Sequence, residues 1–179
     1  MRKKINRLVV LIVVILLAMT NLAYAQPIPK QNIQYGPKIS ELKNKQDIIK
    51  NFQDIKTIRT NIATINIREN STNEQLIAVN TSIRNYINEY QQVIRNLEEH
   101  KRTYSDSISD VFFSDQISFI AQSFVISLRH QQNLIRALQG TEEESKRIFY
   151  SSYLIPVYYY LTLGDQMIAY IDNYFTLPD

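Results

Sequence analysis

The residues that could do chemistry are few and widely spaced in this chain. It has two histidines, His100 and His130, and neither has a second histidine four residues away, the spacing with which one helix face holds a metal ion. Neither has a glutamate three residues before it, as the Glu-x-x-His motif of di-iron bundles requires. The chain has no cysteine, which excludes thiolate ligands, a cysteine nucleophile and disulfides. We therefore expect no metal and no cofactor.

Other catalytic arrangements are also missing from the sequence. The three glycines, Gly36, Gly140 and Gly164, are isolated, whereas a phosphate-binding loop needs several glycines close together. No serine lies in a Gly-x-Ser-x-Gly motif. The acidic run at residues 142–144 lies at a predicted helix N-terminus, where negative charge is favourable. The sequence therefore predicts a protein that is not an enzyme.

Residues 1–25 have the order of a secretory signal peptide: a basic start, an apolar run over residues 8–19, and Ala23-Tyr24-Ala25 before Gln26. The apolar run is 12 residues long, shorter than the roughly 20 residues that span a membrane. We expect cleavage between Ala25 and Gln26. This interpretation predicts an exported protein, periplasmic or extracellular, that meets the membrane only through the segment that is removed.

Loss of this segment would change the charge balance. The whole chain has 20 Lys and Arg against 17 Asp and Glu, and four of the bases lie in residues 1–25. A mature charge near −1 gives no indication of nucleic-acid binding. Residues 26–69 carry a net charge of +4 and residues 70–179 one of −5. Such a charge difference is typical of ordinary solvated helix faces. Alternatively, the opposite charges could attract neighbouring subunits, or dock the N-terminal segment on an acidic surface.

Apolar residues recur at three- and four-residue steps, the spacing of helices, over most of the chain after a proline-containing extended leader at residues 26–38. Residues 39–65 predict a first helix with Ser40 as N-cap. Ser71 and Glu74 have the spacing of a capping box, which predicts the start of a second helix. Further helices are expected over residues 114–139, with Gly140 as a left-handed C-terminal residue, and over residues 141–155. Residues 39–179 should thus form one all-α domain, an antiparallel bundle of four to five helices.

The second helix is the best specified element and should be a central rod of about 30 residues, roughly 45 Å long. Its regular seam could belong to an intermolecular coiled coil, but the flanking Ile87 and Ile94 widen the apolar stripe, as in a helix that packs against two neighbours. We therefore favour packing within the chain. The seam comprises Leu76, Val79, Ile83, Tyr86, Tyr90, Val93, Leu97, His100 and Tyr104.

The C-terminal segment is rich in tyrosine and has no Lys or Arg after Arg147. Residues 157–175 fit either a short final helix after Gly164 or a β-hairpin, and the helix is favoured because no other strand is available for pairing. Tyrosine combines apolar area with a polar tip and is frequent in interfaces as well as at the wet margin of a core. Three consecutive tyrosines cannot all face one core from a single helix. The candidate partner-contact residues are Tyr153, Tyr158, Tyr159, Tyr160, Tyr170 and Tyr174.

Three functions agree with these features. The leading hypothesis is an exported, non-enzymatic helical bundle that acts by protein contact or self-association, as an adaptor or assembly component. In layout the chain also resembles exported minor subunits of bacterial conjugation and type IV secretion machines, with a cleaved leader, a proline-containing lead-in, long Gln/Asn-rich helices and an aromatic end. The third is a bundle that binds a small apolar ligand near Phe112, Phe113, Phe119 and Phe124.

Three short tripeptides match glycosylation acceptors. Asn70 and Asn80 each begin an N-glycosylation tripeptide. Asp106-Ser107-Ile108 resembles an O-glycosylation acceptor of certain bacteria, and it alone lies in a predicted exposed loop.

Overall fold

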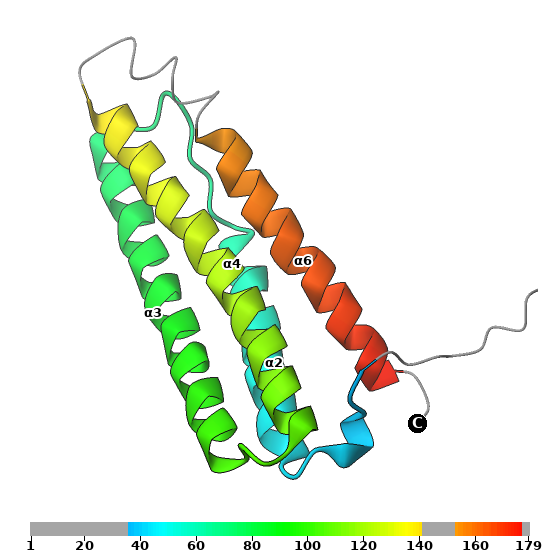
Figure 1. Cartoon of the computed structure of the whole chain (residues 1–179). Coiled ribbons are helices and arrows are strands. Elements are labelled where there is room, and N and C mark those ends of the chain that lie inside the picture. The colour runs from blue at the N-terminus through cyan, green and yellow to red at the C-terminus, as the bar shows by residue number, and fades with distance from the viewer. Residues whose placement is uncertain (1–35, 141–152, 177–179) are drawn as a thin grey trace, which may run out of the picture. The chain divides into compact units, whose positions relative to one another are not determined.

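Four α-helices and one short 3-10 helix make up the part of the chain that the computed structural model describes, residues 36–140 and 153–176 (Figure 1). No strand occurs in this part, which confirms the all-α prediction. The expected signal peptide, nearly all of the leader and most of the helix expected over residues 141–155 lie outside the described residues. The elements are η1 (Ile39–Glu41), α2 (Lys45–Ile62), α3 (Asn73–Thr103), α4 (Ile108–Gln139) and α6 (Leu154–Thr176).

The N-cap residues of the first two long helices differ from those predicted from the sequence. Ser40 lies inside η1, and α2 begins after Asn44, whose side chain accepts a hydrogen bond from the Asp47 amide at 3.3 Å. The capping box of α3 is displaced by one residue: the Thr72 hydroxyl accepts from the Gln75 amide, and the Gln75 side chain accepts from the Thr72 amide at 2.9 Å. Ser71 instead accepts a hydrogen bond from the Arg68 amide.

Helix α4 begins six residues earlier than predicted, with Ser107 as its N-cap. The Ser- and Asp-rich stretch that resembled a loop therefore supplies a cap and the first helical turn. Ser107, the hydroxyl residue of the candidate O-glycosylation tripeptide, is buried and hydrogen-bonds the Asp110 carboxylate, so the prediction that this residue is exposed is wrong. Asp106 and Ile108 beside it are exposed. Gly140 follows the helix with φ −71°, so the prediction of a left-handed residue there is also wrong.

Residues 154–176 form one continuous helix rather than a hairpin or a short helix after Gly164. Pro156 lies in the first turn of α6, where a backbone N–H has no helical partner to lose. Gly164 lies in the interior of the helix and does not interrupt it.

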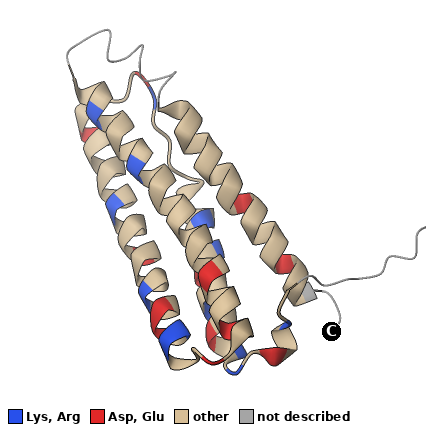
Figure 2. Cartoon of the chain, in the orientation of Figure 1, with Lys and Arg blue, Asp and Glu red and all other residues tan. Residues whose placement is uncertain are grey.

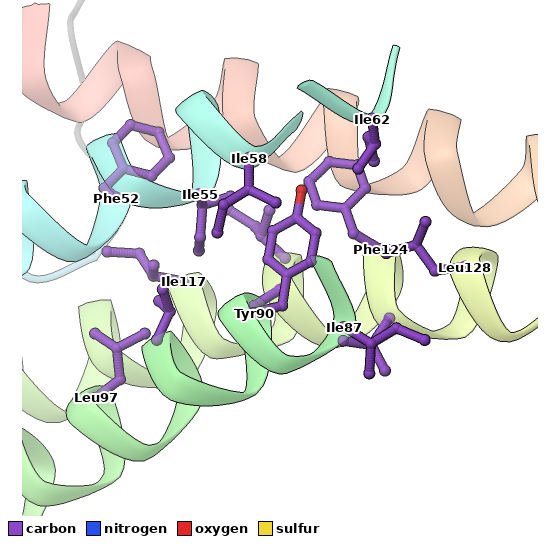
Figure 3. Close-up of a cluster of buried hydrophobic side chains, with 14 of the residues drawn as sticks. Phe52, Ile55, Ile58, Ile62, Ile87, Tyr90, Leu97, Ile117, Phe124 and Leu128 are labelled. Atoms are coloured by element: carbon purple, nitrogen blue, oxygen red, sulfur yellow. The ribbon is translucent and has the colours of Figure 1, made fainter. Parts of the chain in front are cut away.

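The core is formed where the apolar stripes of the helices face one another within the chain. Helix α3 packs along α4, and α4 packs along α6, while α2 contacts both α3 and α4. Of the two residues that widen the stripe of α3, Ile87 is buried and Ile94 is half-buried against the core, as expected for a helix with two neighbours. Figure 3 shows the Tyr90 ring beside Phe124 among aliphatic side chains of α2, and these two rings stack with centroids 5.5 Å apart.

Within the described residues, α4 is the one helix that is long and apolar enough to cross a membrane. However, 61% of its most apolar stretch is buried inside the structure. Several polar residues on this helix are buried as well, among them Ser118 and Ser127. This burial is typical of the core helix of a helical domain.

Candidate functional site

The candidate surface lies on α6, which is held by contacts from two helices. The Ser127 hydroxyl of α4 donates a hydrogen bond to the Val157 carbonyl oxygen at 3.0 Å. Near the other end of α6, the Tyr174 and Phe175 rings pack against Phe113, with centroids 5.3 and 6.2 Å away, and Phe175 also stacks on Phe52 of α2 at 5.5 Å. These contacts fix which face of α6 is turned inward.

Two ion pairs join α6 to α2. Arg59 donates two hydrogen bonds of 2.8 Å to the Asp165 carboxylate, and the Lys56 ammonium lies 2.9 Å from Asp172. Side-chain hydrogen bonding to Asp165 raises the pKa of Arg59 against the opposing effect of burial. Together with the pair that Lys43 forms with Asp106 near α4, these contacts bring the basic and acidic parts of the sequence together within one chain.

The outer face of α6 is apolar, aromatic and almost free of charge. The charged residues in the sequence of α6 are Asp165 and Asp172, the acids already paired with α2, and most of the helix is tan in Figure 2. Ile155 is 69% exposed, Tyr158 63%, Tyr159 61% and Tyr170 43%. Covering such large side chains with a partner is favourable, because it removes apolar surface from water. We call this set, Ile155, Tyr158, Tyr159 and Tyr170, the α6 outer face.

The other candidate tyrosines are placed differently. Tyr160 is half-buried and stacks on His130 of α4, with ring centroids 6.1 Å apart, and Tyr153 is half-buried. Tyr174 is only 8% exposed and belongs to the core, where burial, followed by its hydrogen bond with Tyr170, raises its pKa to about 12. We therefore leave Tyr174 out of the surface, because a core residue is not available to a partner.

A groove of about 360 Å³ lies beside this surface. Tyr158 and Leu161 of α6 line one part of it. Another part is lined by the last residue of α2 and by the segment that follows, namely Ile62, Ala63, Ile65, Asn66 and Ile67. Its chain segments are far apart in the sequence, so no local pattern could have revealed it. None of the phenylalanines predicted to surround a small ligand lines the groove, and Phe113 and Phe124 are fully buried in the core.

No protein-family model, curated protein or solved structure matches this chain. No group of three His, Asp or Glu side chains that could hold a metal ion occurs in residues 36–140 and 153–176.

Proposed function

We propose that this protein is an exported, non-enzymatic helical bundle that acts by protein contact, and that the α6 outer face is its contact surface. The partner is another protein or a second copy of this chain. The observation that carries the proposal is the exposure of Ile155, Tyr158 and Tyr159 on consecutive turns of a helix whose only acids are turned to α2. Aromatic residues on a charge-poor surface are the composition that protein interfaces favour.

The proposal includes an antiparallel arrangement of the four helices. Residues early in α4 lie near residues late in α6, as Phe113 does near Tyr174, while Ser127 lies near Val157. This order supports opposite directions for α4 and α6. In such a bundle the outer face of α6 is a continuous strip, and the neighbouring groove gives room for an apolar side chain of the partner.

Export is the second part of the proposal and rests on the signal-like order of residues 1–25. It is tested by sequencing the N-terminus of the protein isolated from its producing cell. A mature N-terminus at Gln26 in a periplasmic or extracellular fraction is expected. An intact N-terminus, or recovery from the cytoplasm, would contradict export while leaving the contact surface to be tested separately.

The contact surface is tested with the double variant Tyr158→Ser/Tyr159→Ser. Both side chains are more than half exposed, so the variant should keep its helical circular dichroism and its unfolding midpoint. Association, measured by sedimentation velocity and by capture of the partner with the tagged protein, should be lost. Tyr160 is unsuitable for this test because its ring also packs on His130.

A matched control is available on another helix. Ile77 of α3 is also an exposed large apolar residue, so Ile77→Ser removes similar area from a different surface. Its association should equal that of the unchanged protein. If both variants associate normally, the α6 outer face is not the contact surface; if the tyrosine variant loses its helical signal, the two tyrosines serve the fold instead.

A further inference from the structure

His100, near the C-terminal end of α3, lies between two carboxylates that belong to other parts of the fold. Its side chain is 2% exposed. Its Nε2 atom lies 2.9 Å from Oδ1 of Asp110 on α4, and its Nδ1 atom lies 3.7 Å from Oδ2 of Asp47 on α2. Within the described part of the chain, Nδ1 is buried and has no hydrogen-bond partner. One ring nitrogen is therefore satisfied and the other is not.

The protonation of Nε2 follows from the state of Asp110, whose side chain is fully buried. Burial opposes its ionisation, but hydrogen bonds from the Ser107 hydroxyl, the Lys43 amide, His100 and the Asn44 amide together lower the pKa of Asp110. An ionised carboxylate can only accept hydrogen bonds. Nε2 of His100 must therefore carry a proton and donate it to Asp110.

The state of Nδ1 follows from this assignment. In a neutral imidazole with a proton on Nε2, Nδ1 has a lone pair and is an acceptor. It then faces the carboxylate of Asp47, which is an acceptor as well, so neither group satisfies the other. A second proton turns Nδ1 into a donor, and a small approach of the two groups makes a charge-assisted hydrogen bond.

The other charged and titratable groups around the ring are few. Glu99 of α3 and Lys50 of α2 line the same cleft, and Lys50 forms an ion pair of 2.7 Å with Asp54. The Tyr104 ring packs against the imidazole with centroids 4.7 Å apart. The cleft side of the ring thus carries the carboxylates of Asp47 and Glu99 and the ammonium of Lys50. On the other side, Asp110 also accepts from the Lys43 amide, and the Lys43 ammonium pairs with Asp106.

We propose that His100 is a proton-operated clasp, which joins the start of α2, the end of α3 and the start of α4 when both of its nitrogens are protonated. Protonation strengthens the contact to Asp47 and keeps the one to Asp110. The clasp stabilises the fold while the imidazole is charged, and this contribution is lost as the pH rises and the imidazole becomes neutral. This inference does not depend on the proposed contact function.

The first test compares Asp47→Asn with the unchanged protein in urea unfolding between about pH 5 and 8, where histidines in proteins change charge. The unfolding midpoint of the unchanged protein should be higher at the acidic end. The asparagine amide can donate to a neutral Nδ1, so the variant should lose at least half of this pH difference. Asp54→Asn makes the same chemical change on α2 next to Lys50 and should keep the difference. Equal pH differences in all three proteins would overturn the proposal.

The second test observes the proton directly in the folded protein. The chain has two histidines, and Nδ1 and Nε2 of each ring can be followed by ¹⁵N NMR, with His130→Gln to assign the signals. In the unchanged protein His100 should be doubly protonated at the acidic end, and in Asp47→Asn it should lose its second proton at a lower pH. A neutral His100 throughout the range would overturn the clasp even if a variant failed to fold.

Discussion

A Cβ atom placed on Gly164 of α6 would lie 2.5 Å from Cε1 of Phe124 on α4. Real Cβ atoms essentially never come so close to another heavy atom. Phe124 is fully buried, and its ring also stacks on Tyr90. The missing side chain at Gly164 is therefore what allows α6 to approach the core helix at this level, and the position of the α6 outer face depends on it.

Gly164→Ala should destabilise the fold by about 1–3 kcal/mol, because the new methyl group would overlap the fully buried Phe124 ring, which must shift to make room. Alanine is the better helix former by about 1 kcal/mol, so the steric cost must exceed this gain for the prediction to hold. Urea unfolding measures the difference. Ala169→Gln, which adds atoms on the exposed side of the same helix, should leave the unfolding free energy nearly unchanged. Equal stability of the Gly164 variant and the unchanged protein would show that α6 does not pack on Phe124 in this way.

Asp110→Asn should lower the unfolding free energy by about 3 kcal/mol, because it removes a buried charge that accepts hydrogen bonds from three segments. Since the pKa of Asp110 is lowered in the fold, its ionised form stabilises the protein above the ordinary aspartate value of 3.8, and this contribution is lost as the pH falls through the lowered value. The variant should therefore lose less stability in acid. Asp106→Asn, at an exposed carboxylate nearby, should have little effect. An acid profile identical to that of the unchanged protein would contradict this role.

Tyr90→Phe should be neutral or stabilise the fold by up to about 1 kcal/mol. The Tyr90 hydroxyl is buried and has no hydrogen-bond partner among the described residues, so its removal costs no hydrogen bond. Tyr90→Ala, in contrast, should cost about 3–5 kcal/mol, because it leaves a cavity beside Phe124. Thermal and urea unfolding of both variants give the comparison. A loss of more than about 1 kcal/mol in the phenylalanine variant would reveal a partner for the hydroxyl.

Helix positions could be predicted from the sequence, because the apolar residues that face the core recur with the period of a helix. The seam residues Ile83 and Leu97 of α3 are both fully buried. Helix starts were less predictable, because adjacent polar residues compete to cap them. Ser71 and Thr72 differ little as caps, and the structure uses Thr72 because Gln75 returns a hydrogen bond to it.

The start of α4 was missed for a different reason. Asp110 is polar and fully buried, which no local pattern suggests. Its partners include the amides of Lys43 and Asn44, more than 60 residues away in the sequence. The environment that makes a buried Asp110 tolerable therefore exists only in the folded chain.

The candidate surface could be predicted in part. Three consecutive tyrosines cannot all face one core, and in the structure Tyr158 and Tyr159 are exposed while Tyr160 contacts His130. Which tyrosine faces outward depends on the rotation of α6, and that is set by long-range contacts such as the one between Arg59 and Asp165. The sequence shows the composition of this segment but not these contacts.

The most direct measurement is site-specific photo-cross-linking in the cell that produces the protein. A photoreactive amino acid replaces Tyr159 on the α6 outer face and, in a second protein, the exposed Ile77 on α3. We expect a discrete cross-linked product, with a partner protein or a second copy, from position 159 and none from position 77. No product from position 159, or the same products from both positions, would contradict a contact surface on α6.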